Sequence, residues 1–265
     1  MARDDEHAEE ELAEGTLISH LVELRTRLVY MVTAIGIIFI CLVPFAQEVY
    51  TFVAEPMMRS LPEGQDMIAT GVATPFLTPF KTTLFAALFI AMPVVLYQGW
   101  RFVAPGLYKN EQRFAFPLVV SSIILFYAGT AFAYIVVFPL VFDFFSLAVP
   151  EGVVQAPDIN QYLDFVLTIF FAFGLAFEVP IVTFMLVWSR LTTVEALGKI
   201  RAYVFLGAFV AGMFLTPPDI ISQTLLAIPM YLLYEGGLIL SRILLADRIK
   251  KDKEEKAAEE AAADD

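Results

Sequence analysis

Three acidic residues are the first candidates for chemistry, because each has unusual surroundings. Glu178 lies within an otherwise uncharged stretch over residues 165–189, which is long enough to cross a membrane. Glu23 and Glu111 each stand just outside such a stretch, among arginines and lysines. Carboxylates in these settings can pair with neighbouring cations or accept a guanidinium group from another molecule. Each of the three acids is therefore a candidate functional group with a structural alternative.

Glu23 belongs to the segment SHLVELRTRL over residues 19–28. Helical spacing places His20, Glu23 and Arg27 along one face, where neighbouring side chains could hold the carboxylate at the membrane surface. The alternative is an interfacial helix whose basic residues only anchor it to lipid headgroups. This segment alone leaves both interpretations open.

Glu111 is the only acid of the segment WRFVAPGLYKNEQR over residues 100–113. It could bind an external cation, or it could form a weak surface pair with Lys109 or Arg113. For Glu178, a carboxylate deep in the bilayer costs about 2.5–3.5 kcal/mol, which favours a functional role. The structural alternative is a hydrogen bond to a nearby hydroxyl or to a carbonyl freed at Pro180.

The segment TPPD over residues 216–219 suggests a structural role. Two prolines end one helix, and Asp219 can cap the next, which is favoured over direct binding. Gln223, four residues later, would share a helical face with Asp219.

Bond-making chemistry finds no support in the sequence. It contains no Walker A, HExxH, GxSxG or dinucleotide-binding GxGxxG motif. The single cysteine, Cys41, rules out an internal disulfide, and no Cys/His cluster has metal-ligand spacing. We therefore expect no enzyme activity, no cofactor and no metal.

The composition is that of a membrane protein, with 58% hydrophobic and only 17% charged residues. We expect an all-α protein with six transmembrane helices in a domain over residues 19–246. An acidic tail over residues 1–18 would precede it, and a charged tail over residues 247–265 would follow. The approximate expected spans are 28–47, 80–103, 114–141, 162–188, 202–216 and 221–243.

The positions of the 17 Lys and Arg residues predict the orientation. All but Arg59 and Lys81 fall on one side of the expected spans, and that side should be the cytosol. Both termini would then be cytosolic, and residues 47–77 would form a long outside loop. The net charge of −12 lies mostly in the tails and argues against nucleic-acid binding.

The fifth span is short, because the apolar part before the TPPD segment covers only residues 203–215. At 1.5 Å per residue this is roughly 20 Å of helix. Either the membrane thins there, or the fifth and sixth helices form a hairpin that does not fully cross.

Four motifs taken together resemble the TatC family, the polytopic subunit of the twin-arginine protein translocase. They are HLxELR at 20–25, APGLYxxE at 104–111, FGxxFExP at 173–180 and TPPD at 216–219. The resemblance covers residues 19 to about 245 and implies a receptor for signal peptides that carry paired arginines on folded cargo. By this resemblance Glu23 and Glu111 form the cytosolic recognition site, and Arg25 and Phe102 line or support it.

The resemblance also implies a cupped bundle with short fifth and sixth helices, in which Glu178 faces the concave side within reach of water. Single-span TatA-like and TatB-like partners would pack near Glu178, Met213, Thr216 and Gln223. Pro56 and Asp219 would be structural cap or loop positions. Such a protein lies in the bacterial inner membrane, contacts lipids, assembles in several copies and uses the proton-motive force.

The sequence offers two alternatives to this function. A proton-coupled transporter of a small solute would use Glu178 as its coupling carboxylate, but no matched pair of broken helices accompanies that residue. An intramembrane enzyme would need a nucleophile–base pair or a metal cluster within the spans.

Overall fold

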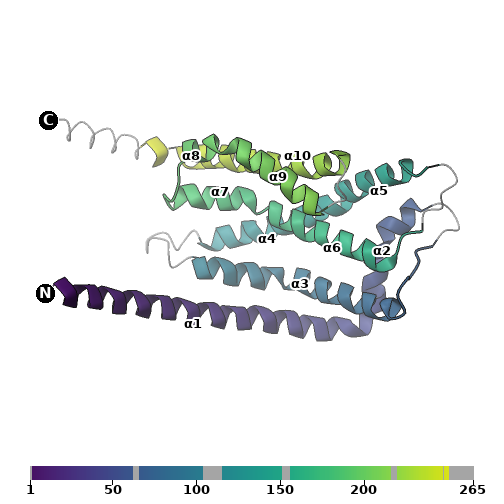
Figure 1. The fold of residues 1–265 in the computed structure, drawn as a ribbon, viewed down its shortest axis with the longest axis horizontal. Coiled ribbons are helices and arrows are strands. Elements are labelled where there is room, and N and C mark those ends of the chain that lie inside the picture. The colour runs from purple at the N-terminus through teal and green to yellow at the C-terminus, as the bar shows by residue number, and fades with distance from the viewer. Residues whose placement is uncertain are drawn as a thin grey trace. The chain divides into compact units, whose positions relative to one another are not determined.

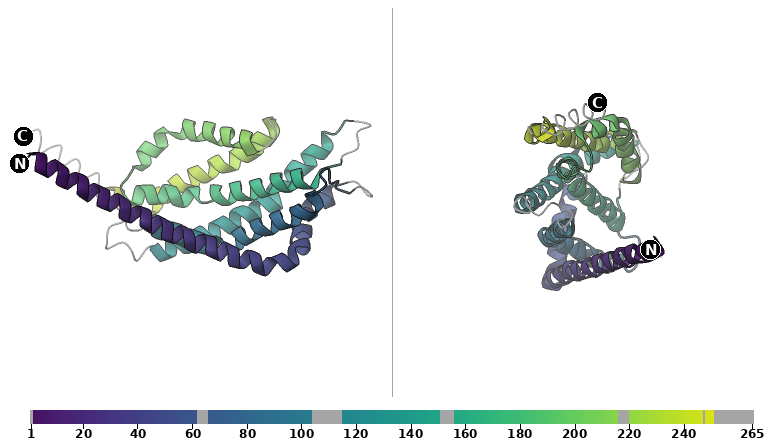
Figure 2. Two further views of the ribbon diagram at one scale, coloured as in Figure 1. Left: turned by 60° about the horizontal axis from the view of Figure 1, so that its bottom comes forward. Right: turned by 90° about the vertical axis from the view of Figure 1, so that its left-hand side faces the viewer.

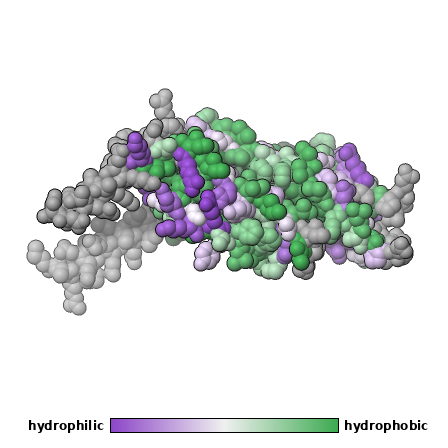
Figure 3. Space-filling model, turned by 90° about the horizontal axis from the view of Figure 1, so that it is seen from above, coloured by the Kyte–Doolittle hydropathy of each residue, from purple (hydrophilic) through white to green (hydrophobic). Residues whose placement is uncertain are grey.

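The computed structural model describes residues 2–61, 66–103, 115–150, 156–215, 220–246 and 248–250, and it is helical throughout these ranges apart from turns and one isolated β-bridge (Figure 1). Five helical segments are long and apolar enough to cross a membrane, and the helix Arg201–Leu215 is apolar but shorter. The five long segments are Leu21–Arg59, Thr74–Phe102, Phe116–Leu147, Ile159–Trp188 and Gln223–Leu244. Hydrophobic side chains cover most of the face in Figure 3. The expected all-α membrane protein is confirmed.

The chain divides into two compact units, each described by itself here. The first unit contains residues 1–53 and 71–123, and its main contact joins α1 (Ala2–Leu42) to α3 (Thr74–Val103), which run side by side (Figure 2). The first residues of α4 (Ala115–Phe132) complete it. Because α1 begins at Ala2, the helix extends through most of the segment expected to be a separate tail.

The expected outside loop over residues 47–77 is partly wrong, because most of its first half is helical. A 3₁₀ turn (η1, Val43–Phe45) leads from α1 into α2 (Ala46–Ser60). Pro56 lies inside α2 and is therefore neither a cap nor a loop residue. An interior proline costs a helix about 3 kcal/mol. Burial of the neighbouring Ala54 and Met57 side chains offsets part of that cost.

The second unit contains residues 54–70 and 124–265. Its helices follow α4 in chain order: the π-helical turn η4 (Ala133–Val137), α5 (Phe138–Leu147), α6 (Ile159–Ala176), α7 (Val179–Trp188), α8 (Val194–Lys199), α9 (Arg201–Leu215) and α10 (Ile220–Leu244). Phe126, Phe138 and Phe173 are fully buried in its core. Gly174 lets the Phe126 ring approach α6, since a Cβ there would collide with the ring.

Asp158 caps the N-terminus of α6 and accepts hydrogen bonds from Thr70, which is far away in the sequence. Its Oδ1 accepts the amide hydrogens of Asn160 (2.9 Å) and Gln161 (3.1 Å). Its Oδ2 accepts hydrogen bonds from the hydroxyl (2.7 Å) and the amide (2.9 Å) of Thr70. These bonds, led by that of the Thr70 hydroxyl, lower the pKa of Asp158 from 3.8 to about 2.

The last two apolar helices differ in length. The helix α9 has 15 residues, roughly 22 Å, which is less than the ~30 Å of a hydrocarbon core. The helix α10 has 25 residues, roughly 37 Å, so the expectation of a short sixth helix is wrong. Glu235 interrupts its apolar sequence, and the helix continues through that position, where Glu235 forms an ion pair with Arg201 (2.6 Å).

Candidate functional site

An ion pair near the start of the apolar part of α1 is the centre of the candidate site. Nε of Arg27 donates a hydrogen bond to Oε1 of Glu23 (3.1 Å), and Nη2 of Arg27 contacts the same oxygen. The third guanidinium nitrogen, Nη1, donates to Oε1 of Gln98 on α3 (3.3 Å). The shared helical face expected for Glu23 and Arg27 is therefore present, and α3 contributes a partner to it.

Local sequence explains why this pair forms. Residues four apart lie on one helical face, and a glutamate placed N-terminal to its basic partner is the more favourable order. The Arg27 side chain is only 12% exposed, whereas that of Glu23 is 33% exposed. The arginine is thus largely covered by protein, while the carboxylate remains open to a ligand.

The free hydrogen-bonding capacity of the pair lies on the carboxylate. Among the described residues, hydrogen bonds reach only Oε1 of Glu23, which leaves Oε2 as an acceptor. An ionised carboxylate has about four acceptor positions and can take a bidentate guanidinium. The arrangement can therefore bind a second cation without first losing Arg27.

The end of α3 brings further polar and aromatic groups into the first unit. The guanidinium of Arg101 lies 6.0 Å from the centre of the Tyr97 ring, and Nε1 of Trp100 donates to Oγ of Ser122 on α4 (2.9 Å). Phe102 is half-buried and lies one residue before the end of α3. Arg25 is exposed on α1, two residues before Arg27.

Three predicted site residues fall outside the described part of the chain. Glu111 lies in residues 104–114, and Thr216 and Asp219 lie in residues 216–219. Their predicted roles therefore remain predictions.

Glu178 occupies a break between two helices and not the middle of one. The expected fourth span divides into α6 and α7, and Glu178 is the N-cap residue of α7 without a side-chain cap bond. Pro180 explains the break, since proline suits a first helical turn but would disturb a helix interior. Glu178 is only 8% exposed, so its expected position within reach of water is wrong for the isolated chain.

Two other predicted residues lie where α9 meets α10. Met213 is 48% exposed on α9, and Gln223 is half-buried on α10. The helices approach closely here, because a Cβ on Gly212 would stand 3.4 Å from the carbonyl oxygen of Gln223. The structure thus brings Gln223 against α9 while leaving the Met213 side chain open.

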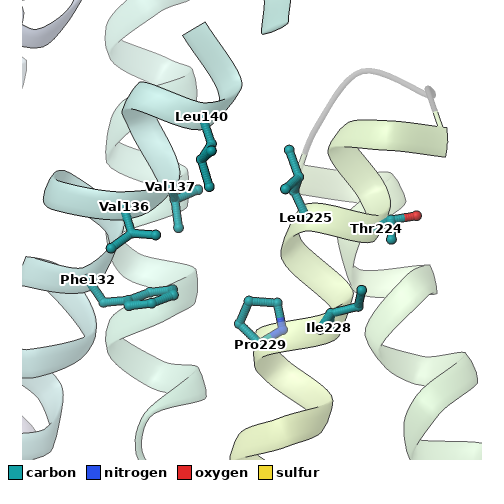
Figure 4. Close-up of a pocket in the computed structure, with 8 residues that line it drawn as sticks. All are labelled: Phe132, Val136, Val137, Leu140, Thr224, Leu225, Ile228 and Pro229. Atoms are coloured by element: carbon teal, nitrogen blue, oxygen red, sulfur yellow. The ribbon is translucent and has the colours of Figure 1, made fainter. Parts of the chain in front are cut away.

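An apolar cavity of ≈ 170 Å³ lies in the second unit between the α4–η4–α5 segment and α10. Figure 4 shows its lining: Phe132, Val136, Val137, Leu140, Thr224, Leu225, Ile228 and Pro229. The only hydroxyl, that of Thr224, donates to the carbonyl of Ile220 (2.6 Å) and points away from the cavity. The cavity offers contact to apolar groups and no catalytic side chain.

Comparison with known proteins places these features in a family. The family description "Sec-independent protein translocase protein (TatC)" matches residues 19–229. The chain belongs to the TatC family. A TatC of Azotobacter chroococcum is 57% identical over 83% of this chain and 87% of its own length. That of Escherichia coli K12 is 52% identical over 85% and 88%.

The fold comparison agrees with the sequence comparison. A crystal structure described as the twin arginine translocase receptor TatC is similar to this chain with a TM-score of 0.76 at 38% identity. The similarity covers 84% of this chain and 98% of that one. The resemblance inferred from the four motifs is confirmed, and the chain is a Sec-independent translocase subunit, which is a transport component and not an enzyme. The solute-transporter alternative is therefore set aside.

Sequence reasoning missed Gln98 and the Trp100–Ser122 hydrogen bond. Gln98 is the only amide side chain in the uncharged stretch over residues 82–100, and that could have marked it. Its partner could not be found in this way, since Arg27 is 71 positions away.

Proposed function

We propose that the chain is the cytosolic receptor for signal peptides with paired arginines on folded cargo, and that Glu23 is a binding group. The single observation that carries this proposal is the Glu23 carboxylate, which is 33% exposed, balanced by Arg27 and, among the described residues, open at Oε2. The matched family and the receptor description of a similar crystal structure support it.

The geometry explains how arginine could be preferred over lysine. In the absence of peptide, Arg27 keeps the charge of Glu23 balanced, which limits attraction of arbitrary cations. A guanidinium presents a planar fork of donors that can use Oε2 and a second acceptor together. A lysine ammonium is a compact point charge that cannot copy this geometry. By family resemblance Glu111 supplies the second carboxylate, and Arg25 and Phe102 border the site.

We further propose six membrane crossings with both termini in the cytosol of a bacterium, within its inner membrane. Five long apolar helices and the shorter α9 support the number. The basic residues support the orientation, because only Arg59 and Lys81 would face outward. A cupped bundle accommodates the short α9 in a locally thinned membrane.

The partners belong to the same proposal. Single-span TatA-like and TatB-like subunits would contact Met213, Thr216 and Gln223, and Glu178 would influence that contact from the α6–α7 break. Asp219 would cap α10. The assembly would contain several copies of this chain and use the proton-motive force for transport.

The test is direct binding to the full chain in lipid nanodiscs. A fluorescent signal peptide with paired arginines is compared with the same peptide carrying paired lysines. Glu23→Gln and Glu111→Gln should each weaken binding of the arginine peptide at least about ten-fold, the usual scale for losing a hydrogen bond to a charged group. The lysine peptide should bind weakly to all forms.

The chain offers a matched control for this test. Glu55 forms an ion pair with Arg59 (2.5 Å) at the same four-residue spacing on α2, outside the proposed site. Glu55→Gln should leave both affinities unchanged. Unaltered discrimination in Glu23→Gln and Glu111→Gln, with and without a TatB-like partner, would show that the site is wrongly assigned.

A further inference from the structure

The helices α9 and α10 meet along one regular seam in the second unit. On α9 the seam contains Arg201, Phe205, Ala208 and Gly212, which recur every three or four positions and so share one helical face. Ala208 and Gly212 are the buried residues of this helix. The remaining large side chains of α9 are mostly exposed, so the helix is held chiefly by this stripe.

Three contacts between α9 and α10 lie along this seam. Gly212 approaches the backbone of Gln223 at one end. The rings of Phe205 and Tyr231 pack edge to face in the middle, with centroids 5.3 Å apart. An ion pair between Arg201 and Glu235 closes the other end.

The ion pair is the most polar of these contacts. Nη2 of Arg201 donates to Oε2 of Glu235 (2.9 Å), and Nε of Arg201 lies 2.6 Å from Oε1. The hydroxyl of Tyr231 also donates to Oε1 (2.9 Å). Both oxygens of the carboxylate are therefore engaged, two of the three contacts coming from a residue on the other helix.

The position of the pair makes it costly to break. Glu235 lies within an apolar helix long enough to cross a membrane, and its side chain is 22% exposed. A charge left without its partner in such surroundings is strongly unfavourable. Separation of α9 from α10 at this end would leave Glu235 without its partner, whereas the Arg201 side chain is 40% exposed.

We infer that Arg201 and Glu235 form a latch that positions α9 against α10 and so fixes the face on which Met213 and Gln223 meet a single-span partner. The two latch residues are positioning residues, since they lie at the opposite end of the seam from Gly212 and Gln223. The latch itself rests on the observed contacts. Its effect on a partner also rests on the proposed function.

The latch is tested by measuring the distance between α9 and α10 in the full chain. Spin labels are placed at Leu206→Cys and Leu232→Cys, which are 60% and 61% exposed, with Cys41→Ser to remove the exposed native thiol. Pulsed electron resonance in nanodiscs then gives the distance distribution. Arg201→Gln and Glu235→Gln should each broaden it about two-fold, as expected for a coupled pair that has lost one member.

Three further variants make the result specific. The charge-reversed pair Arg201→Glu with Glu235→Arg should restore a narrow distribution, which neither misfolding nor a lost side chain would do. Tyr231→Phe should have a small effect, because it keeps the ring contact with Phe205. Lys199→Gln removes the same charge from an exposed side chain just before α9 and should change nothing.

A second readout separates the latch from the proposed partner contact. A photoreactive amino acid at Phe214, which is 81% exposed beside Met213, should crosslink to a TatA-like or TatB-like subunit. Arg201→Gln should lower the yield about five-fold, and the charge-reversed pair should recover it. Binding of the paired-arginine peptide should stay within about two-fold, which would show an intact first unit.

The outcomes are distinct. Unchanged distances in both Arg201→Gln and Glu235→Gln would overturn the latch. Unchanged distances with reduced crosslinking would also overturn it, because Arg201 would then act on the partner directly. Broadened distances with normal crosslinking would overturn the inferred effect of the latch on the partner face, although Arg201 and Glu235 would still position α9. Absence of crosslinking in the unaltered chain would instead contradict the partner contact in the proposed function.

Discussion

Nη1 of Arg27 donates a hydrogen bond to Oε1 of Gln98 at 3.3 Å and thereby joins α1 to α3 across 71 positions of the sequence. Since Nε and Nη2 of the same guanidinium contact Glu23, Gln98 fixes the orientation of the whole ion pair. The carboxylate is thus presented by two helices, although it belongs to one. Such support from a neighbouring residue is what holds a binding group in a defined geometry.

Replacement of Arg27 should reduce selectivity more than binding. In Arg27→Gln the Glu23 carboxylate loses its balancing charge and becomes a general attractor of cations. We expect the paired-lysine peptide to bind about ten-fold more tightly, so that the ratio between arginine and lysine peptides falls. Fluorescence anisotropy with both peptides measures this ratio. Arg59→Gln, which breaks the exposed Glu55–Arg59 pair, is the control and should leave the ratio unchanged.

Replacement of Gln98 tests whether α3 helps to position the Glu23–Arg27 ion pair. Gln98→Leu removes the acceptor for Nη1 of Arg27, and a hydrogen bond to a charged group contributes about 1.5–3 kcal/mol. Because Gln98 acts on the peptide only through Arg27, we expect only part of that energy to be lost, about 0.7–1.4 kcal/mol, which is a three- to ten-fold fall in affinity for the paired-arginine peptide in nanodiscs. Gln98→Glu retains an acceptor at the same place and should bind more tightly than Gln98→Leu. Equal losses in the two variants would mean that Gln98 does not act through Arg27.

The contact between Asp158 and Thr70 should depend on pH only under acid conditions. The pKa of Asp158 is lowered from 3.8 to about 2, so its ionised form stabilises the folded state. That contribution is fully present above the unfolded pKa of 3.8 and is lost as the pH falls toward 2. Amide hydrogen exchange of Thr70 and Gln161, corrected for the intrinsic pH dependence, should show constant protection above about pH 5 and a decline below it.

Thr70→Val provides the matched variant for this pH prediction. It removes the hydroxyl donor, the largest cause of the lowered pKa, and keeps the amide donor. The loss of protection should still begin near the unfolded pKa of 3.8, but it should be smaller and should end at a higher pH than in the unaltered chain. The same pH dependence in both proteins would contradict the assigned role of the Thr70 hydroxyl.

The lengths of the uncharged stretches and the spacing of charged residues predicted much of the fold. Uncharged stretches of sufficient length predicted the long apolar helices, and the interval before the TPPD segment predicted the short α9. The Glu23–Arg27 pair followed from spacing alone, because the two residues lie on one helix. These inferences need only local geometry and transfer free energy.

Local breaks and contacts between helices were harder to predict. The stretch over residues 165–189 has no charge except Glu178, so its hydropathy cannot show where a helix ends. Pro180 marked the break, but proline is also tolerated within transmembrane helices. The helix α2 was missed because its mixed polar and apolar residues suggested a loop. The Arg201–Glu235 pair, 34 positions apart, required knowledge of which helices pack together.

Two adjacent glycines on α10 give the sharpest test of the packing in the second unit. A Cβ on Gly237 would collide with Thr183 and would stand 2.8 Å from Cα of Pro180, whereas a Cβ on Gly236 would meet nothing within 4 Å. Gly237→Ala should therefore force α7 and α10 apart and destabilise the protein by about 1–3 kcal/mol. Gly236→Ala should be neutral or slightly stabilising, because alanine favours the helix.

This prediction is checked by measuring the Tm of Gly237→Ala and Gly236→Ala by thermal unfolding in the same detergent. A lower Tm for Gly237→Ala alone is expected, since the two substitutions add the same methyl group one residue apart. Thr183→Ala combined with Gly237→Ala should recover only part of the loss, because the Pro180 backbone remains in place. Equal Tm values for the two single variants would mean that α7 and α10 do not pack at Gly237 in the membrane protein.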